Sequence, residues 1–163
     1  MSDAFVYTTP DDPLARPLVE ELSYEYDSRY SEFYIGTTMV REMDRFGPEV
    51  FAPPHGAFVL LLRDGEAVGG GAFMRRDETT AEVKRVWTRS TLRRQGIAQA
   101  VMAELEAQAL RQGYARIYLT TGFRQPEAVG LYLTLGYTAL FDTAAPPEKV
   151  LKLPFTKAIA ASP

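Results

Sequence analysis

The sequence contains no cysteine and a single histidine, His55, among its 163 residues. The absence of cysteine excludes disulfides, thiolate metal sites and a cysteine nucleophile. A single histidine excludes a metal site built from clustered histidines, so we expect no bound metal. His55 lies between a proline and a glycine, and we interpret it as a loop residue.

Long hydrophobic runs and an excess of positive charge are also missing. No apolar stretch approaches the ~20 residues that a membrane-crossing helix needs, and the first residues do not resemble a signal peptide. We therefore expect a cytoplasmic protein without a membrane partner. The net charge of −3 argues against a broad basic face, so we expect no nucleic-acid partner.

The hydrophobic pattern predicts a single α+β domain over residues 1–163, because length and composition suit one hydrophobic core. We predict strands at 4–9, 57–63, 67–76, 80–88, 116–120, 137–141 and 149–153. About four helices flank them, one after Asp11 or Asp12 and others at 37–46, 96–112 and 126–135. Three consecutive strands predict an antiparallel meander, and the strand–helix–strand order that follows predicts one parallel pair.

The most distinctive segment joins the strand at 80–88 to the helix at 96–112. It carries Arg89, Arg93 and Arg94, and Gly96 opens the helix. The backbone N–H groups of such a turn, together with the positive end of the helix dipole, form an anion site that usually binds phosphate. A solvated run of charge is the alternative, but the glycine-opened helix start favours a phosphate ligand.

Two well-known phosphate-binding patterns are absent from this segment. The string G-x-x-x-x-G-K-[ST] of a P-loop occurs nowhere in the chain, and residues 94–98 do not supply the G-x-G-x-x-G of a dinucleotide fold. What remains is R-x-x-G-x-A, formed by Arg93, Gly96 and Ala98. The phosphate group must therefore belong to another kind of ligand.

This string resembles the acetyl-CoA motif [Q/R]-x-x-G-x-[G/A] of the GCN5-related N-acetyltransferase (GNAT) superfamily. A second element of that family, N-x-x-A-x-x-x-Y-x-x-x-G-[F/Y], resembles residues 125–137, with Gln125 in place of the asparagine and matches at Ala128, Tyr132 and Gly136. The resemblance covers about residues 57–141, the acetyl-CoA core. It implies a mixed, mostly antiparallel sheet of about seven strands with a V-shaped split between the fourth and fifth.

The resemblance also implies acetyl-CoA as the acyl donor. Its pyrophosphate would bind the backbone N–H groups of residues 94–99, and its pantetheine arm would pair with Val86 and Thr88 as an added strand. A backbone N–H near Val86 or Trp87 would polarise the thioester carbonyl. The residues that the resemblance places at the donor are Val86, Trp87, Thr88, Arg93, Arg94, Gln95, Gly96, Ile97, Ala98, Gln99, Gln125 and Ala128.

Two side chains are candidates for catalysis. Tyr132 would protonate the departing thiolate, since a thiol titrates near ~8.5 and a tyrosine near ~10; core packing is its alternative role. Glu82 would accept the proton of the amine, and strand alternation predicts that Glu82, Lys84 and Val86 share one face. The alternative for Glu82 is a strand carboxylate paired with Lys84 or Arg85.

The expected function is therefore direct transfer of acetyl from acetyl-CoA to a primary amine of a small molecule or an amino-acid-like acceptor. The alternative is a non-catalytic sensor or interaction module that binds CoA or acyl-CoA, which would need neither Tyr132 nor Glu82. An unrelated nucleotide-binding protein is a third class, but the chain lacks its strings. No pattern in the sequence decides between a monomer and a homodimer.

Overall fold

The computed structural model describes residues 2–30, 46–122, 125–146 and 152–160. Their strands form one mixed sheet in the order β1-β2-β3-β4-β5-β7-β6. The strands are β1 (Asp3–Tyr7), β2 (Ala57–Arg63), β3 (Glu66–Arg75), β4 (Thr80–Thr88), β5 (Arg116–Gly122), β6 (Thr138–Ala139) and β7 (Lys152–Ala158). The helices are α1 (Arg16–Tyr30), α2 (Ile97–Arg111) and α3 (Pro126–Thr134), with short 3₁₀ turns η1 (Pro13–Ala15), η4 (Pro48–Phe51) and η5 (Ser90–Leu92).

These elements confirm the α+β class and the expected number of strands. The described residues contain three α-helices rather than about four, and the helix predicted at 37–46 lies outside them except for its last residue. The antiparallel meander β2-β3-β4 is confirmed. Asp64 and Gly65 both have positive φ, 51° and 85°, as a type I′ hairpin turn requires.

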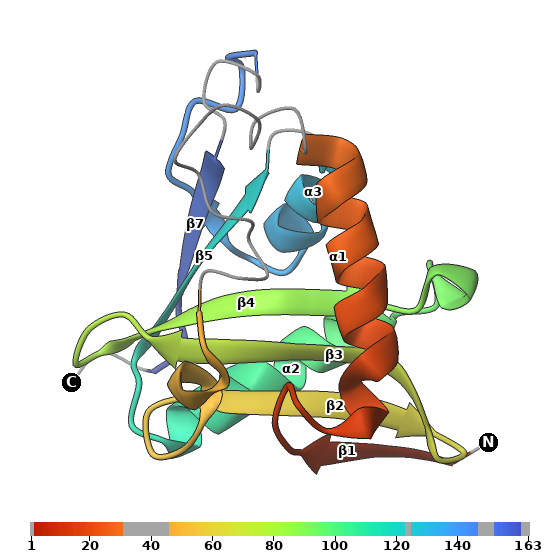
Figure 1. Ribbon diagram of the computed structural model, residues 1–163. Coiled ribbons are helices and arrows are strands. Elements are labelled where there is room, and N and C mark those ends of the chain that lie inside the picture. Colours follow the sequence, from red (N-terminus) through yellow and green to blue (C-terminus); the bar gives the residue numbers. More distant parts are fainter. Residues whose placement is uncertain (1, 31–45, 123–124, 147–151, 161–163) are drawn as a thin grey trace.

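The strands β4 and β5 run parallel and pair only near their starts. Residues 80–82 pair with residues 116–118, and no later residue of either strand continues the ladder. Beyond this point β4 runs on to Thr88 and β5 to Gly122, and Figure 1 shows the two strands diverging. The V-shaped split expected between the fourth and fifth strands is therefore confirmed.

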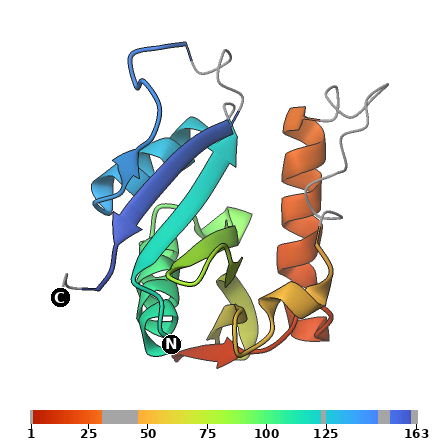
Figure 2. The same cartoon turned by 90° about the vertical axis from the view of Figure 1, so that its left-hand side faces the viewer.

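Helices cover both faces of the sheet. Figures 1 and 2 show α1 on one face and α2 on the other. On the α1 side, one buried cluster includes Leu18, Leu22, Phe58, Leu60 and Trp87. The α2 side has a larger cluster that extends to α3, including Val59, Phe73, Val101, Leu105, Ile117, Tyr132 and Phe155.

Glycines in β3 set how closely α2 lies against the sheet. A Cβ on Gly69 would lie 2.5 Å from Cγ2 of Ile97, and one on Gly71 would lie 2.8 Å from Cδ1 of Leu105. Side chains at these positions would push the helix away, so the glycines permit its close approach to the sheet. Because Ile97 is the first residue of α2, Gly69 fixes where that helix begins.

The last strand differs from its prediction. The sequence predicts a strand at 149–153, of which 149–151 lie outside the described residues, whereas β7 spans Lys152–Ala158 and pairs along the whole of β5. Pro154 lies within β7 although it has no N–H to donate. Its carbonyl nevertheless accepts a hydrogen bond from the N–H of Leu140 at 2.8 Å, so the proline stays inside the strand.

Candidate active site

An extra residue in β4 changes which side chains face the site. Three residues of β3, from Gly70 to Ala72, lie opposite four of β4, from Trp87 back to Lys84, and Arg85 has a positive φ of 61°. This is a β-bulge, and it shifts the alternation of side chains by one. Beyond it Val86 packs against the α2-side cluster while Trp87 belongs to the α1-side cluster.

The bulge makes one prediction from the sequence wrong. Glu82, Lys84 and Val86 were expected on one face by simple alternation. Lys84 instead lies over the ring of Phe46 on the α1 side, with its Nζ 5.1 Å from the ring centroid, while Val86 faces α2. The α1 side also receives Arg85, whose guanidinium lies 4.8 Å from the centroid of the Phe51 ring.

The turn from β4 into α2 exposes a row of backbone donors. Arg94 and Gly96 have positive φ, 66° and 79°, and they bend the chain into the helix. Gly96 is the N-cap and provides no side chain to satisfy the first turn of α2. Within the described part of the chain, the N–H groups of residues 94–99 donate no hydrogen bond. These donors and the helix dipole form an anion site.

The fold brings together the residues of this turn that were predicted to bind the acetyl donor. Buried Ile97 anchors the turn in the core and Ala98 is half-buried. The other predicted residues of the turn are exposed: Arg93, Arg94, Gln95, Gly96 and Gln99. The start of α2 therefore places backbone N–H groups and two exposed arginine side chains close together, an arrangement that suits an anion.

The open edge of β4 lies next to this turn. Because β4 and β5 pair only at 80–82, the edge of residues 86–88 has no strand beside it on the β5 side among the described residues. Trp87 is 2% exposed and lies opposite Gly70 of β3, so its neighbours Val86 and Thr88 supply the backbone of the open edge. Such an edge can accept an extended ligand as an added strand.

The start of α3 faces this edge from the β5 arm of the split. The Gln125 carbonyl oxygen, Oε1, accepts a hydrogen bond from the N–H of Gly122 at 3.0 Å, which closes the connection from β5 to α3. Ala128 is half-buried against the α2-side cluster. The two residues predicted at the donor, Gln125 as the N-cap of α3 and Ala128 within it, therefore lie on the β5 arm of the split. Gln125 contributes by closing the turn from β5 to α3.

Glu82 lies at the vertex of the split, at the last pair between β4 and β5. Its Oε1 is 3.1 Å from Nη1 of Arg76 and its Oε2 is 3.2 Å from Nζ of Lys84. The side chain is 12% exposed. The pairing with Lys84 agrees with the alternative considered for Glu82, whereas Arg76, which also stacks on Tyr118 at 3.6 Å, is a partner that the sequence reasoning missed.

Tyr132 lies in the α2-side cluster on α3. Its ring centroid is 5.7 Å from that of Tyr137 and 5.6 Å from that of Phe155. Burial raises the pKa of the Tyr132 hydroxyl above its ordinary value, so the group is protonated at neutral pH. The hydroxyl makes no hydrogen bond within the described residues. Since Ala81 and Ile117 beside Glu82 also belong to this cluster, Glu82 and Tyr132 approach the split from opposite faces of the sheet.

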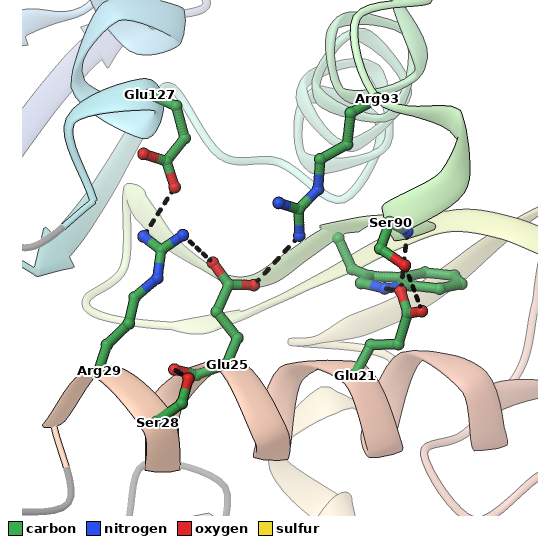
Figure 3. A network of polar contacts seen from close by, with 8 residues as sticks. Glu21, Glu25, Ser28, Arg29, Ser90, Arg93 and Glu127 are labelled. Carbon is green, nitrogen blue, oxygen red and sulfur yellow. Dashed lines mark hydrogen bonds and ion pairs between the residues drawn. The ribbon is translucent and has the colours of Figure 1, made fainter.

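Three charged residues of α1 also reach the site, and the sequence reasoning missed them. Figure 3 shows Glu21 and Glu25 directed toward the β4–α2 turn, and Arg29 directed toward the start of α3. Glu25 lies 3.8 Å from Arg93, and Arg29 lies 2.7 Å from Glu127. The signal was present, because the three residues recur every four positions beside the apolar positions Leu18, Leu22 and Tyr26.

The carboxylate at the start of α3, that of Glu127, forms an ion pair with Arg29 of α1. Burial raises the pKa of the Glu127 carboxyl, but its own backbone N–H and Arg29 together outweigh burial and leave the pKa below its ordinary value. Arg29 also contacts Glu25 at 3.4 Å. Helix α1 thus links the β4–α2 turn to α3 on the other arm of the split.

The described part of the chain lacks two other kinds of feature. It holds no group of three or more histidine, cysteine, aspartate and glutamate side chains placed to hold a metal ion. None of its helices combines the length and the hydrophobicity needed to cross a membrane.

Comparisons with known proteins agree with the fold. The model of the acetyltransferase (GNAT) family matches residues 19–137. The uncharacterized N-acetyltransferase YjgM of Escherichia coli (strain K12) is 26% identical over 133 residues, which cover 80% of this chain and 78% of that protein. A GNAT family acetyltransferase from Staphylococcus aureus MU50 superimposes with a TM-score of 0.71 at 15% identity, over 98% of this chain and 100% of that chain.

One solved structure with a similar fold contains the expected donor. A GNAT family acetyltransferase from Elizabethkingia anophelis, crystallised with acetyl-CoA bound, superimposes with a TM-score of 0.63 at 13% identity. The superposition covers 96% of this chain and 97% of that chain. At this level of identity the likeness establishes the fold alone.

Proposed function

Because the chain belongs to the acetyltransferase (GNAT) family, we propose that it transfers acetyl from acetyl-CoA directly to a primary amine of a small molecule or an amino-acid-like acceptor. The protein is an acetyltransferase, and enzymes of this family take the acetyl group from acetyl-CoA. The observation that carries the proposal is the row of N–H groups at residues 94–99, which have no hydrogen-bond partner among the described residues and lie beside the open edge of β4.

The donor is proposed to lie along the split. The N–H groups of residues 94–99 would bind its pyrophosphate, with Arg93 and Arg94 beside it. Its pantetheine arm would extend along the backbone of Val86 and Thr88, with Gln125 and Ala128 on the opposite arm. Three observations support this placement: the positive φ angles at the turn, the exposure of both arginines, and the absence of a ladder partner beyond residue 82 on the β5 side.

The proposed reaction uses Glu82 at the vertex of the split and Tyr132 on α3. The neutral amine nitrogen attacks the thioester carbonyl carbon, a C–N bond forms, and the C–S bond breaks to release the thiolate of CoA. Tyr132, protonated at neutral pH, gives its proton to the sulfur. The proton lost by the amine goes to Glu82, directly or through water. A backbone N–H near Val86 stabilises the carbonyl oxygen as it becomes negative.

A thermal shift experiment first tests whether the protein binds acetyl-CoA. Acetyl-CoA at about 100 times its Kd should stabilise the fold by ~2.7 kcal/mol, a rise in Tm of roughly 5–10 °C for a chain of this size. ATP and NAD at the same concentrations should give no comparable rise. No shift with acetyl-CoA at millimolar concentration would contradict the proposal.

A panel of amines then tests the acceptor. Amino acids, polyamines, peptide N-termini and aminoglycosides are incubated with acetyl-CoA, and release of free thiol is followed with a chromogenic disulfide. The proposal expects thiol release that depends on a small amine and yields the N-acetyl product by mass spectrometry. Release only with peptide or protein substrates would overturn the small-molecule part of the proposal.

A further inference from the structure

One carboxylate of α1, that of Glu21, makes three hydrogen bonds to the end of β4 and the β4–α2 turn. Oε1 of Glu21 accepts hydrogen bonds from Nε1 of Trp87 at 2.9 Å and from the backbone N–H of Ser90 at 3.0 Å. Oε2 accepts a third from the hydroxyl of Ser90 at 2.9 Å (Figure 3). One side chain therefore binds both the end of β4 and the first residue of η5.

The carboxylate supplies a cap that the turn does not provide for itself. The N-cap of η5 is Arg89, whose side chain makes no capping bond and instead donates to the carbonyl of Ala67 at 2.6 Å. The first N–H of η5 is satisfied by Glu21, from a different helix. Such a bond to a charged acceptor is stronger than a neutral one, so it restrains the turn firmly.

The environment keeps Glu21 in the charged form that makes these bonds. Burial raises the pKa of its carboxyl, but the hydrogen bonds from Trp87 and Ser90 outweigh burial and leave the pKa below its ordinary value. Trp87 is 2% exposed, so its indole N–H has no access to bulk water and depends on this acceptor.

We propose that Glu21 is a positioning residue for the donor: it holds the turn from Ser90 to Gly96 so that the N–H groups of residues 94–99 converge on the pyrophosphate. This inference rests on the proposed function. The turn is fixed at its far end by Ile97 against Gly69, and Glu21 fixes the near end. Without Glu21 the near end loses its three hydrogen bonds to α1 and keeps the bonds of Arg89, the packing of Leu92 and the ion pair of Arg93 with Glu25, which hold the N–H groups of residues 94–99 less firmly in place.

Glu21→Ala removes all three bonds, whereas Glu21→Gln can keep them. The amide oxygen still accepts from Trp87 and from the Ser90 N–H, and the amide nitrogen can donate to the Ser90 hydroxyl once that hydroxyl rotates. Glu20→Ala is the matched control, because Glu20 is exposed on the same helix and makes no contact within the described residues.

The first measurement is the Kd of CoA by calorimetry for each full-length variant. Glu21→Ala should weaken binding about tenfold, the equivalent of ~1.4 kcal/mol, while Glu21→Gln and Glu20→Ala stay within about twofold of the wild type. Ser90→Ala, which keeps the Trp87 bond and one bond to the turn, should weaken binding about threefold and decides the question if Glu21→Ala does not fold. Unchanged CoA binding in both variants overturns the inference.

The second measurement separates positioning from general destabilisation. The value of kcat/KM is compared for acetyl-CoA and for S-acetyl-pantetheine, which lacks the pyrophosphate. Glu21→Ala should raise KM for acetyl-CoA with kcat within about twofold, and should leave kcat/KM for S-acetyl-pantetheine unchanged. An equal loss with both donors would mean that Glu21 only stabilises the fold. A wild-type enzyme that does not prefer acetyl-CoA would instead overturn the pyrophosphate site itself.

Discussion

Gly69→Ala is expected to displace the start of α2 and with it the proposed phosphate site. The new Cβ would lie 2.5 Å from Cγ2 of Ile97 and 3.3 Å from the carbonyl oxygen of Trp87. Carbon atoms pack at about 3.5–4.0 Å, so the helix start must move by ~1 Å. Overpacking of this kind costs ~1–3 kcal/mol of unfolding free energy.

The same displacement should weaken the binding of CoA. A shift of ~1 Å lengthens hydrogen bonds from the first turn of α2 beyond useful range, and losing one such bond to a charged group costs ~1.5–3 kcal/mol. The Kd of CoA should therefore rise roughly 10- to 100-fold. Urea unfolding measures the loss of stability, and calorimetry measures the Kd.

Two further variants isolate the cause. Gly130→Ala in α3 adds a methyl where nothing lies within 4 Å, so it should stabilise the helix by ~0.5–1 kcal/mol and leave the Kd of CoA unchanged. The double variant Gly69→Ala, Ile97→Ala removes the clashing Cγ2, so its loss of stability should be smaller than the sum of the single losses by at least ~1 kcal/mol. Strict additivity, or wild-type CoA binding in Gly69→Ala, would refute the reasoning.

Three other predictions follow from contacts at the site. Tyr132→Phe should lower kcat by at least ~100-fold and change the Kd of CoA less than twofold; an unchanged kcat removes Tyr132 as the acid. Glu25→Gln removes the carboxylate 3.8 Å from Arg93 and should tighten CoA by up to about fivefold at low salt in calorimetry, whereas weaker binding would contradict a competing role. The lowered pKa of Glu21 contributes stability that is complete above its ordinary value of 4.5 and is lost as the pH falls through the lower folded value. The stability difference between the wild type and Glu21→Gln in urea should thus shrink from about pH 5 downward, and a constant difference would contradict it.

The elements with strong local signals were predictable from the sequence. Turn residues with positive φ, such as Asp64 and Gly65, and the regular apolar spacing of α2 fix boundaries without reference to the rest of the fold. The strand predicted at 149–153 ends too early, because β7 continues through Pro154. In β7 the neighbouring residues complete the ladder with β5, so tertiary pairing overrides the local signal.

The donor side of the site was more predictable than its surroundings. Residues 93–99 form a contiguous motif, so the sequence itself brings them together. The bulge at Arg85 has no sequence signature in a strand without glycine or proline, and it reverses the face of every later residue. The contacts of Glu21 depend on how α1 packs across the sheet, which periodicity suggests but does not orient.

The bulge in β4 has a consequence for how this fold could change its specificity. It divides the strand into two segments. Side chains alternate between the two faces of the sheet within each segment, and the alternation in one segment does not set that in the other. The segment before Arg85 carries Glu82 and Lys84 at the vertex, and the segment after it carries the backbone edge proposed for the donor. Substitutions that reshape the vertex need not disturb the phase of residues 86–88. Related proteins could therefore differ in the acceptor that they use while they bind the same acetyl donor in the same way.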